Sequence, residues 1–190
     1  MNRLKVAVIG HSSRNSITPM AKKFSSKVID FVRKHDCICC SGGCNGIIEF
    51  VNKELSSSGN SVVYYSPSKN IEEHNKLYDI NFPNVESKHF DCGDDLNFNF
   101  IYRSLELIKD ADIVVCFYGT WGTLGELDFA VMLGKTIVFI EEPGRQQLKD
   151  IYKIIDNLSE YNYNERVYVA KDEDELEIIL EKVRESFDNR

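Results

Sequence analysis

The sequence predicts an α/β protein with one doubly wound, mostly parallel sheet of about six or seven strands and helices on both faces, in three layers. Short apolar runs alternate with stretches of helical periodicity from one end of the chain to the other. Three of the apolar runs lead into loops rich in glycine or small polar residues. In a parallel sheet such loops lie at the carboxyl ends of the strands, where ligands bind at a reversal of strand order.

The first predicted strand is the apolar run 5–10, which ends in glycine and is followed by a polar loop. Thr18 and Pro19 have the residue types of a helix N-cap and of the first helical position, and apolar residues at helical spacing follow them. Residues 36–40 predict a second strand, and residues 41–46, "SGGCNG", predict a tight loop.

A helix is predicted from residue 47 to Gly59, where glycine suits a helix end. Residues 61–65 predict a third strand and residues 85–90 a fourth. Between them, the stretch 66–83 is polar, contains two prolines and is long for a connection, so we expect a lid or a binding loop.

Aspartates followed by apolar residues at helical spacing predict a helix over 94–111. The run 112–117 is the clearest buried strand, and a helix over about 122–133 and a strand over 136–140 follow it. The chain is predicted to finish with a helix near 145–158, a strand at 166–170 and a helix that begins at Asp172.

The length of 190 residues fits a single domain over residues 1–190. The net charge of −7 disfavours binding to nucleic acid backbones, because lysine and arginine must neutralise the phosphates. No apolar run is long enough to span a membrane, and the N-terminal one is too short for a signal peptide. We therefore expect a cytoplasmic protein with neither membrane nor nucleic acid as a partner.

Four of the six cysteines cluster in residues 37–44. They lack the paired C-x-x-C spacing of zinc sites, and on a strand Cys37 and Cys39 face one side while Cys40 faces the other. We expect them to fill the core as small apolar side chains in a reducing compartment, and we expect no metal site.

The stretch 118–126, "YGTWGTLGE", joins the predicted strand 112–117 to the next helix. A glycine-rich turn that enters a helix exposes backbone N–H groups near the positive end of the helix dipole, which makes it a phosphate site. The glycines allow close approach of a ligand, and Thr120 and Thr123 add hydroxyl groups. The alternative is that these glycines only form a tight turn.

Four side chains near these loops have two interpretations each. Arg103 lies among apolar residues of its helix and either extends its charge to solvent or reaches an anion. Glu126 lies one turn inside its helix, where a carboxylate also suits the dipole. His11 either contacts a ligand or is a solvated loop histidine, and Trp121 either stacks on a base or packs against the neighbouring helix.

The class of nucleotide is restricted by two missing motifs. The first loop lacks G-x-G-x-x-G, which disfavours an ordinary dinucleotide site, and no G-x-x-x-x-G-K-[ST] occurs, which disfavours a P-loop NTPase. A mononucleotide or a phosphosugar fits better.

These motifs resemble the LONELY GUY (LOG) family and its wider SLOG superfamily of Rossmann-like nucleotide-binding proteins, often mislabelled lysine decarboxylases. The family pattern P-G-G-x-G-T-x-x-E matches at Gly119, Gly122, Thr123 and Glu126. The family arginine lies 16 residues before the first motif glycine, as Arg103 does here. The first strand with its loop and "SGGCNGII" also resemble the family, so that the likeness covers about the first 140 residues.

The resemblance implies a nucleoside 5′-monophosphate phosphoribohydrolase, which cleaves the N-glycosidic bond to release base and ribose 5-phosphate without a cofactor. It implies a homodimer, with Arg103 and Glu126 as the catalytic pair, a role in which a fixed carboxylate would stabilise positive charge on the sugar. The residues expected to bind phosphate or nucleotide are Gly10, Ser12, Gly42, Gly43, Gly46, Gly119, Thr120, Gly122 and Thr123.

Two departures from the family pattern keep a second interpretation open. Tyr118 and Thr120 replace the proline and the second glycine of the motif, and Gly125 stands where the enzymes usually have a second acidic residue. Both changes are typical of divergent superfamily members. The alternative function is therefore a non-catalytic carrier or sensor of a nucleotide or nucleotide-like cofactor.

Overall fold

The structure, a computed structural model, describes residues 3–80, 85–93, 95–142 and 166–188. The described strands form a seven-stranded sheet in which every neighbouring pair is parallel, in the order β4-β3-β2-β1-β5-β6-β7. The strands are β1 Lys5–Ile9, β2 Ile38–Ser41, β3 Val62–Ser66, β4 Glu86–His89, β5 Ile113–Cys116, β6 Thr136–Ile140 and β7 Val167–Ala170. The predicted sheet is confirmed.

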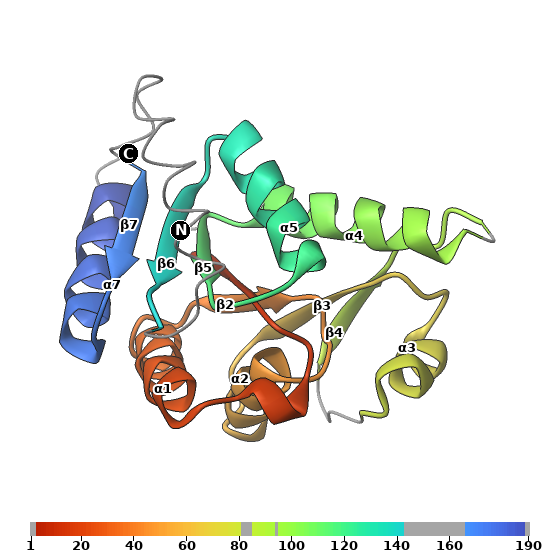
Figure 1. Cartoon of the computed structure of the whole chain (residues 1–190), viewed down its shortest axis with the longest axis horizontal. Helices are drawn as coiled ribbons and strands as arrows, with labels where there is room; N and C mark the ends of the chain where they lie inside the picture. Colours follow the sequence, from red (N-terminus) through yellow and green to blue (C-terminus); the bar gives the residue numbers. More distant parts are fainter. Residues whose placement is uncertain (1–2, 81–84, 94, 143–165, 189–190) are drawn as a thin grey trace.

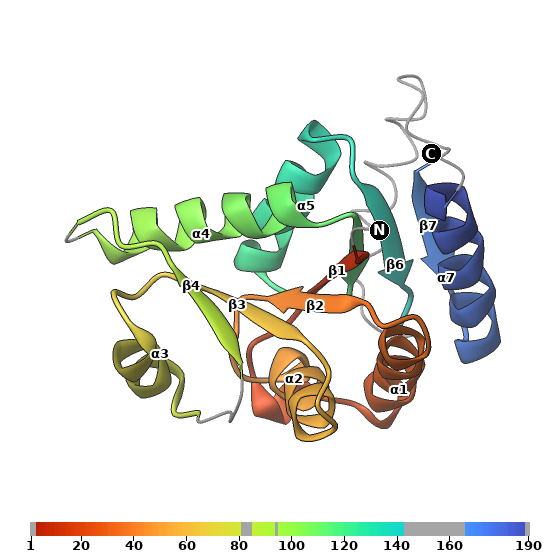
Figure 2. The same ribbon diagram turned by 180° about the vertical axis from the view of Figure 1, so that it is seen from behind.

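The helices cover the two faces of this sheet (Figures 1 and 2). The first face packs against α1, α2 and α7, with Phe24, Leu55 and Leu180 in one buried cluster. The second face packs against α4 and α5, with Leu107 and Leu127 in another. The α-helices are α1 Pro19–Lys34, α2 Ile47–Ser57, α3 Ile71–Tyr78, α4 Leu96–Asp110, α5 Trp121–Met132 and α7 Glu173–Asp188, and a 3₁₀ turn spans Arg14–Ser16. This is the three-layer α/β/α arrangement that the sequence predicts.

The strand order reverses between β1 and β5, which lie side by side at the centre of the sheet. Every residue of β3, β5 and β6 is buried, because helices cover both faces, and this explains their mostly apolar sequences. The switch point of the sheet therefore lies where the loops after β1 and β5 leave their strands.

Several predicted helix ends are confirmed at atomic detail. The Thr18 hydroxyl accepts a hydrogen bond from the backbone N–H of Ala21, with Pro19 in the first turn. Gly59 follows α2 with a φ of +80°, a conformation that favours glycine. Asp172 accepts from the N–H of Glu175 and caps α7. The predicted helix near 145–158 lies outside the described residues.

The prediction of a loop over 66–83 is wrong in its central part, which forms α3. Asn70 caps this helix by accepting from the N–H of Glu73, and the Glu73 carboxylate accepts in turn from the N–H of Lys69. This reciprocal arrangement resembles a capping box. The polar composition concealed a helix that buries one residue, His74. Residues 81–84 lie outside the described part.

The buried cysteines divide between the two faces as predicted. Cys37 and Cys39 lie in the cluster under α1 and α2, and Cys40 lies in the cluster under α4. Burial raises the pKa of Cys37 to about 11 and those of Cys40 and Cys44 to about 12, which makes these thiols poor nucleophiles. Within the described ranges, no group of three potential metal ligands is found. Among the helices in the same ranges, none has the length and apolar character needed to cross a bilayer.

Candidate functional site

The three predicted ligand loops meet at the carboxyl edge of the sheet. The backbone N–H of His11 donates to the Tyr118 carbonyl oxygen at 2.8 Å, which joins the loop after β1 to the loop after β5. A Cβ at Gly46 would lie 2.2 Å from the His11 carbonyl oxygen, so the loop after β2 also packs tightly on the first loop. Glycine is required at Gly46 for this contact and for its φ of +78°.

Arg103 extends from α4 toward the loop after β2. A Cβ at Gly42 would lie 2.2 Å from Nη1 of Arg103, so only glycine leaves room for the guanidinium group. This contact brings a helix on one face of the sheet against a loop that leads into α2 on the other face. The predicted residues Gly42 and Arg103 are thus neighbours, although 61 residues separate them in the sequence.

Arg103 and Glu126 form a buried ion pair between α4 and α5. Nη1 of Arg103 donates to Oε1 of Glu126 at 3.0 Å, and the Ser104 hydroxyl donates to the same oxygen at 3.1 Å. The two residues are only 8% and 5% exposed. Burial disfavours the guanidinium charge, but the neighbouring groups, with the Glu126 carboxylate first among them, together outweigh this effect and raise the pKa of Arg103. The pair therefore holds two opposite charges out of water.

One donor of this pair has no partner in the described part of the structure. Nε of Arg103 is buried without a hydrogen bond. The nearby Tyr78 hydroxyl is also buried and also makes no hydrogen bond. Buried polar atoms are nearly always hydrogen-bonded, so each unsatisfied one needs an explanation. At a site of this kind, a ligand or an ordered water is the explanation that physical chemistry favours.

The start of α5 is the predicted phosphate cradle. Thr120 occupies the N-cap position but its side chain makes no capping hydrogen bond, so the first N–H groups of α5 are not capped by it. A Cβ at Gly119 would lie 1.9 Å from Oγ1 of Thr123, which shows how closely the loop folds over that hydroxyl group. Gly122 and Gly125 have open space beside them.

Two aromatic side chains of these loops differ in role. Trp121 is 87% exposed, so the alternative that it packs against the neighbouring helix is wrong. His11 stacks on Tyr118 with ring centroids 5.7 Å apart, and its Nδ1 accepts from the N–H of Ser13. Its side chain therefore has structural contacts in the loop. Ser12 is exposed at the same edge.

Gly43 lies against a buried histidine that the sequence did not single out. His74 is fully buried, and burial lowers its pKa to about 4, so the ring is neutral at pH 7. Its Nε2–H donates to the Gly43 carbonyl oxygen at 3.0 Å, which leaves Nδ1 to accept from the Ser66 hydroxyl at 2.8 Å. His74 thus fixes the position of the loop after β2 from the side of α3.

The site residues that sequence reasoning missed are Ser104 and His74. Ser104 is adjacent to Arg103 on one helix and could have been noticed as a second partner for Glu126. His74 gave no signal, because it lies in the segment whose helix was not predicted. The structure otherwise brings Arg103, Glu126 and Gly42 together at one point of the carboxyl edge.

These features define a class: a Rossmann-like α/β protein with glycine-rich loops gathered at the switch point of a parallel sheet and a buried Arg–Glu pair beside them. The sequence profile of the SLOG cluster4 family matches residues 3–177, and the chain belongs to this family. It is therefore a divergent member of the SLOG superfamily, as the resemblance of its motifs implied. No curated protein sequence matches the chain.

Solved structures with the same fold have diverse descriptions. The protein TM1055 is 26% identical, with a TM-score of 0.54 and 75% of each chain covered. The molybdenum cofactor binding protein from the phototrophic bacterium Rippkaea orientalis is 16% identical, with a TM-score of 0.65 and coverage of 96% of this chain and 98% of that one. DNA processing protein A from Helicobacter pylori, described with a single-stranded DNA binding mode, is 15% identical, with a TM-score of 0.66 and coverage of 96% and 81%. At such identity the last two likenesses show the fold alone.

Proposed function

We propose that this protein binds a nucleoside 5′-monophosphate, or a chemically similar phosphorylated cofactor, at the carboxyl edge of the sheet. The observation that carries the proposal is the buried Arg103–Glu126 pair next to the uncapped start of α5. A phosphate at α5 would accept hydrogen bonds from backbone N–H groups and from Thr123, in the favourable field of the helix. The pair would then face the sugar. The solved structures of molybdenum cofactor binding proteins are consistent with a ligand of this chemistry.

The charge distribution favours a small ligand. Glu126 neutralises Arg103, so neutral N–H and hydroxyl groups provide the phosphate site rather than a basic surface. The net charge of −7 opposes binding to a nucleic acid backbone. We also infer a cytoplasmic location, because buried free thiols suit a reducing compartment.

Isothermal titration calorimetry with nucleoside 5′-monophosphates tests the binding proposal. Thr123→Val keeps the shape of the side chain and removes its hydroxyl group, so we expect the dissociation constant to rise about tenfold, as for a lost hydrogen bond to a charged group. Thr136→Val is the matched control, because Thr136 is also buried but begins β6 at the opposite edge. Equal affinities of the two variants, or no binding by the natural protein, would contradict the proposal.

The Arg103–Glu126 pair favours a second function, phosphoribohydrolase activity. A carboxylate held by Arg103 and Ser104 is oriented to stabilise positive charge that develops on the sugar or to position a water molecule. Chromatography of reactions with each monophosphate would detect the free base. In Glu126→Gln the Oε1 atom still accepts both hydrogen bonds, but the buried Arg103 charge loses its partner, so circular dichroism must first show that the variant is folded. Base release by the folded variant is expected to fall by about a hundredfold or more. Tight binding with no release would instead assign a carrier or sensor function.

We further propose that two copies associate through the outer side of α4 and α5. These helices expose large apolar side chains, namely Phe98, Ile101 and Tyr102 on α4 and Trp121 and Met132 on α5. Exposed apolar surface of this extent on two adjacent helices marks an interaction site.

A further inference from the structure

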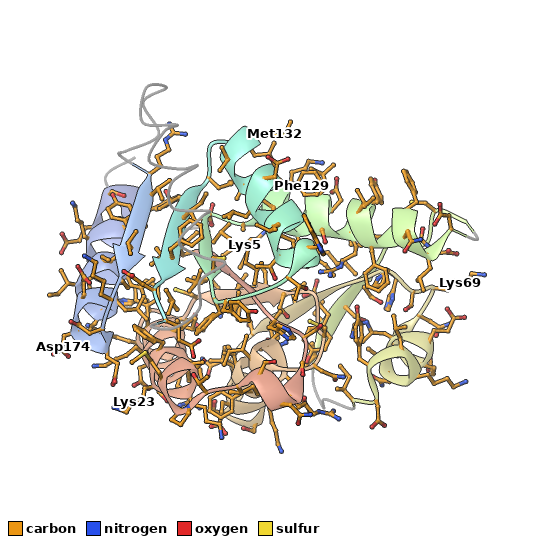
Figure 3. The ribbon with its side chains drawn as sticks, viewed as in Figure 1. Lys5, Lys23, Lys69, Phe129, Met132 and Asp174 are labelled. Atoms are coloured by element: carbon orange, nitrogen blue, oxygen red, sulfur yellow. The ribbon has the colours of Figure 1, made fainter. Side chains whose placement is uncertain are left out.

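A cavity of about 320 Å³ lies between α3 and the start of α4, beyond the carboxyl ends of β3 and β4. Its polar lining includes Lys69, Glu73 and Asp91, and its apolar lining includes Leu77 and Leu96, which are 41% and 45% exposed. Figure 3 shows Lys69 at the end of the molecule where the first turn of α4 faces α3. The volume is at the lower end of the range for small-molecule pockets.

The cavity is next to the proposed nucleotide site along α4. Asn99 lines the cavity, and Arg103 lies one helical turn further on the same buried side, about 6 Å along the axis. Figures 1 and 2 show the N-terminal half of α4 extending past β3, on the side of the molecule where α3 lies. A ligand with its phosphate at α5 and its sugar at the Arg103–Glu126 pair would therefore direct its base toward this cavity. The inference that follows rests on the proposed function.

The side chain of Asn99, on α4, holds the loop that carries Asp91 in place. Oδ1 of Asn99 accepts from the N–H of Cys92 at 2.8 Å, and its Nδ2 donates to the Gly93 carbonyl oxygen at 3.1 Å. The contacts to the Asp91 carboxylate itself are long, at 3.4 Å from both the Gly93 N–H and the Asn99 amide. Asp91 thus stands on a fixed backbone while its oxygens keep most of their capacity to accept hydrogen bonds.

A cation and an anion lie side by side in the lining of this cavity. Nζ of Lys69 is 4.0 Å from Oδ2 of Asp91, which is beyond direct hydrogen-bond distance. The lysine therefore offers donors, and the carboxylate offers two acceptor oxygens, to a group between or above them. The side chains of Leu77 and Leu96 provide apolar surface for the faces of a ring.

We propose that this cavity recognises a 2-amino-4-oxopyrimidine edge, the hydrogen-bonding edge shared by guanine and pterins. On this edge two adjacent N–H groups would donate to Asp91, and the neighbouring carbonyl oxygen would accept from Lys69. Adenine presents an unprotonated ring nitrogen at the corresponding position, and its lone pair would face the carboxylate. The cavity therefore selects against adenine by leaving Asp91 facing an acceptor.

Calorimetric titration of the full chain with guanosine 5′-monophosphate, adenosine 5′-monophosphate and neopterin monophosphate tests this selectivity. We expect the guanine or the pterin ligand to bind at least about tenfold more tightly than the adenine ligand, as for a charge-assisted hydrogen bond. Whichever of guanosine 5′-monophosphate and neopterin monophosphate binds more tightly shows whether the natural ligand carries a guanine or a pterin ring. If the adenine ligand binds as tightly as both, the inference is overturned and the proposed function stands. If none of the three binds, the proposed function fails as well.

Substitutions in the cavity test whether its side chains recognise the base, and a control substitution outside it accounts for general effects on the fold. Asp91→Asn is expected to weaken the preferred ligand about tenfold and to leave adenosine 5′-monophosphate unchanged, because only the former donates to the carboxylate. Glu72→Gln removes the same charge from the exposed side of α3 and should change neither affinity. Lys69→Met should also weaken the preferred ligand selectively, and it decides the question if Asp91→Asn proves unstable. Equal losses for both ligands in Lys69→Met and Asp91→Asn would contradict the inference.

Discussion

Glycine at position 42 determines where the charge of Arg103 lies. A larger residue would displace the guanidinium group from the position that its Nη1 atom occupies. Since Arg103 is the ion-pair partner of Glu126 in the described structure, displacing it would leave a buried carboxylate held only by Ser104. Breaking a buried ion pair in this way is strongly destabilising. Gly42 thus helps to position a charged pair that lies on other elements.

His74 makes the stability of the protein depend on pH in a defined window. The pKa of its imidazole in the folded protein is about 4, below its ordinary value of 6.5, because burial disfavours the charged form. The unfolded chain therefore binds an additional proton between pH 6.5 and 4. The stabilisation is fully present above about pH 6.5 and is lost as the pH falls through this window, by roughly 3 kcal/mol once the pH is below 4.

Urea unfolding at pH 7 and pH 4.5 checks this expectation. In His74→Gln the amide can still donate to the Gly43 carbonyl oxygen, but no imidazole remains to titrate, so the free energy of unfolding should fall less at low pH than in the natural protein. His11→Gln is the control and should keep the full fall, because His11 lies outside this cluster. Parallel pH profiles for all three proteins would contradict the role given to His74.

At the level of single residues, the sequence could predict the pair but not its surroundings. The spacing between Arg103 and Gly119 and the position of Glu126 in the motif pointed to two side chains that the structure brings to 3.0 Å. The structure also shows that Ser104 contacts Glu126, that His74 contacts Gly43, and that Gly42 leaves room for Arg103. Each of these contacts joins segments that are distant in the sequence. Such contacts leave no local pattern, because their partners lie on different elements.

Among the elements, α3 is the one whose sequence conceals its structure. Most of its residues are polar, and Leu77 is exposed, so its apolar periodicity is weak. The signal that remains is the cap, in which Asn70 accepts from the N–H of Glu73 at 2.9 Å. The strands were easier to predict, because burial on both faces makes their sequences mostly apolar.

Asn70→Ala is therefore expected to lower the free energy of unfolding by about 1 kcal/mol, since it removes the N-cap acceptor of α3. Urea unfolding at pH 7 measures the change. Lys76→Ala, an exposed position of the same helix, provides the comparison and should stay within about 0.5 kcal/mol of the natural protein. If the two variants are equally stable, the cap does not contribute as the structure indicates.

At the scale of the whole molecule, the fold assembles its site from loops that are far apart in sequence but share one edge of the sheet. The order β4-β3-β2-β1-β5-β6-β7 places the loops after β2, β1 and β5 next to one another. Alternating strands and helices predict a parallel sheet, but they do not predict which strands are neighbours. For this reason the sequence predicted a common edge, whereas the contact between Gly42 and Arg103 appeared only in the structure.

The proposed pairing of two copies makes a prediction at this scale. Light scattering after size-exclusion chromatography should give twice the chain mass of 21.8 kDa. Ile101→Lys with Met132→Lys places charges on the outer side of α4 and α5, at positions 57% and 72% exposed, and should give the mass of a single chain. Ile178→Lys, 68% exposed on α7, should not change the mass. A single-chain mass for the natural protein would refute the pairing.

The neighbourhood of β1 and β5 has a consequence for biosynthesis. Val6 pairs with Ile113, so the central seam of the sheet joins segments more than half the chain apart. While the ribosome is still producing the first hundred residues, one edge of β1 has no strand beside it and is open to wrong pairing. Ligand affinity should therefore appear late and abruptly during translation, once β5 has left the exit tunnel and closed the seam.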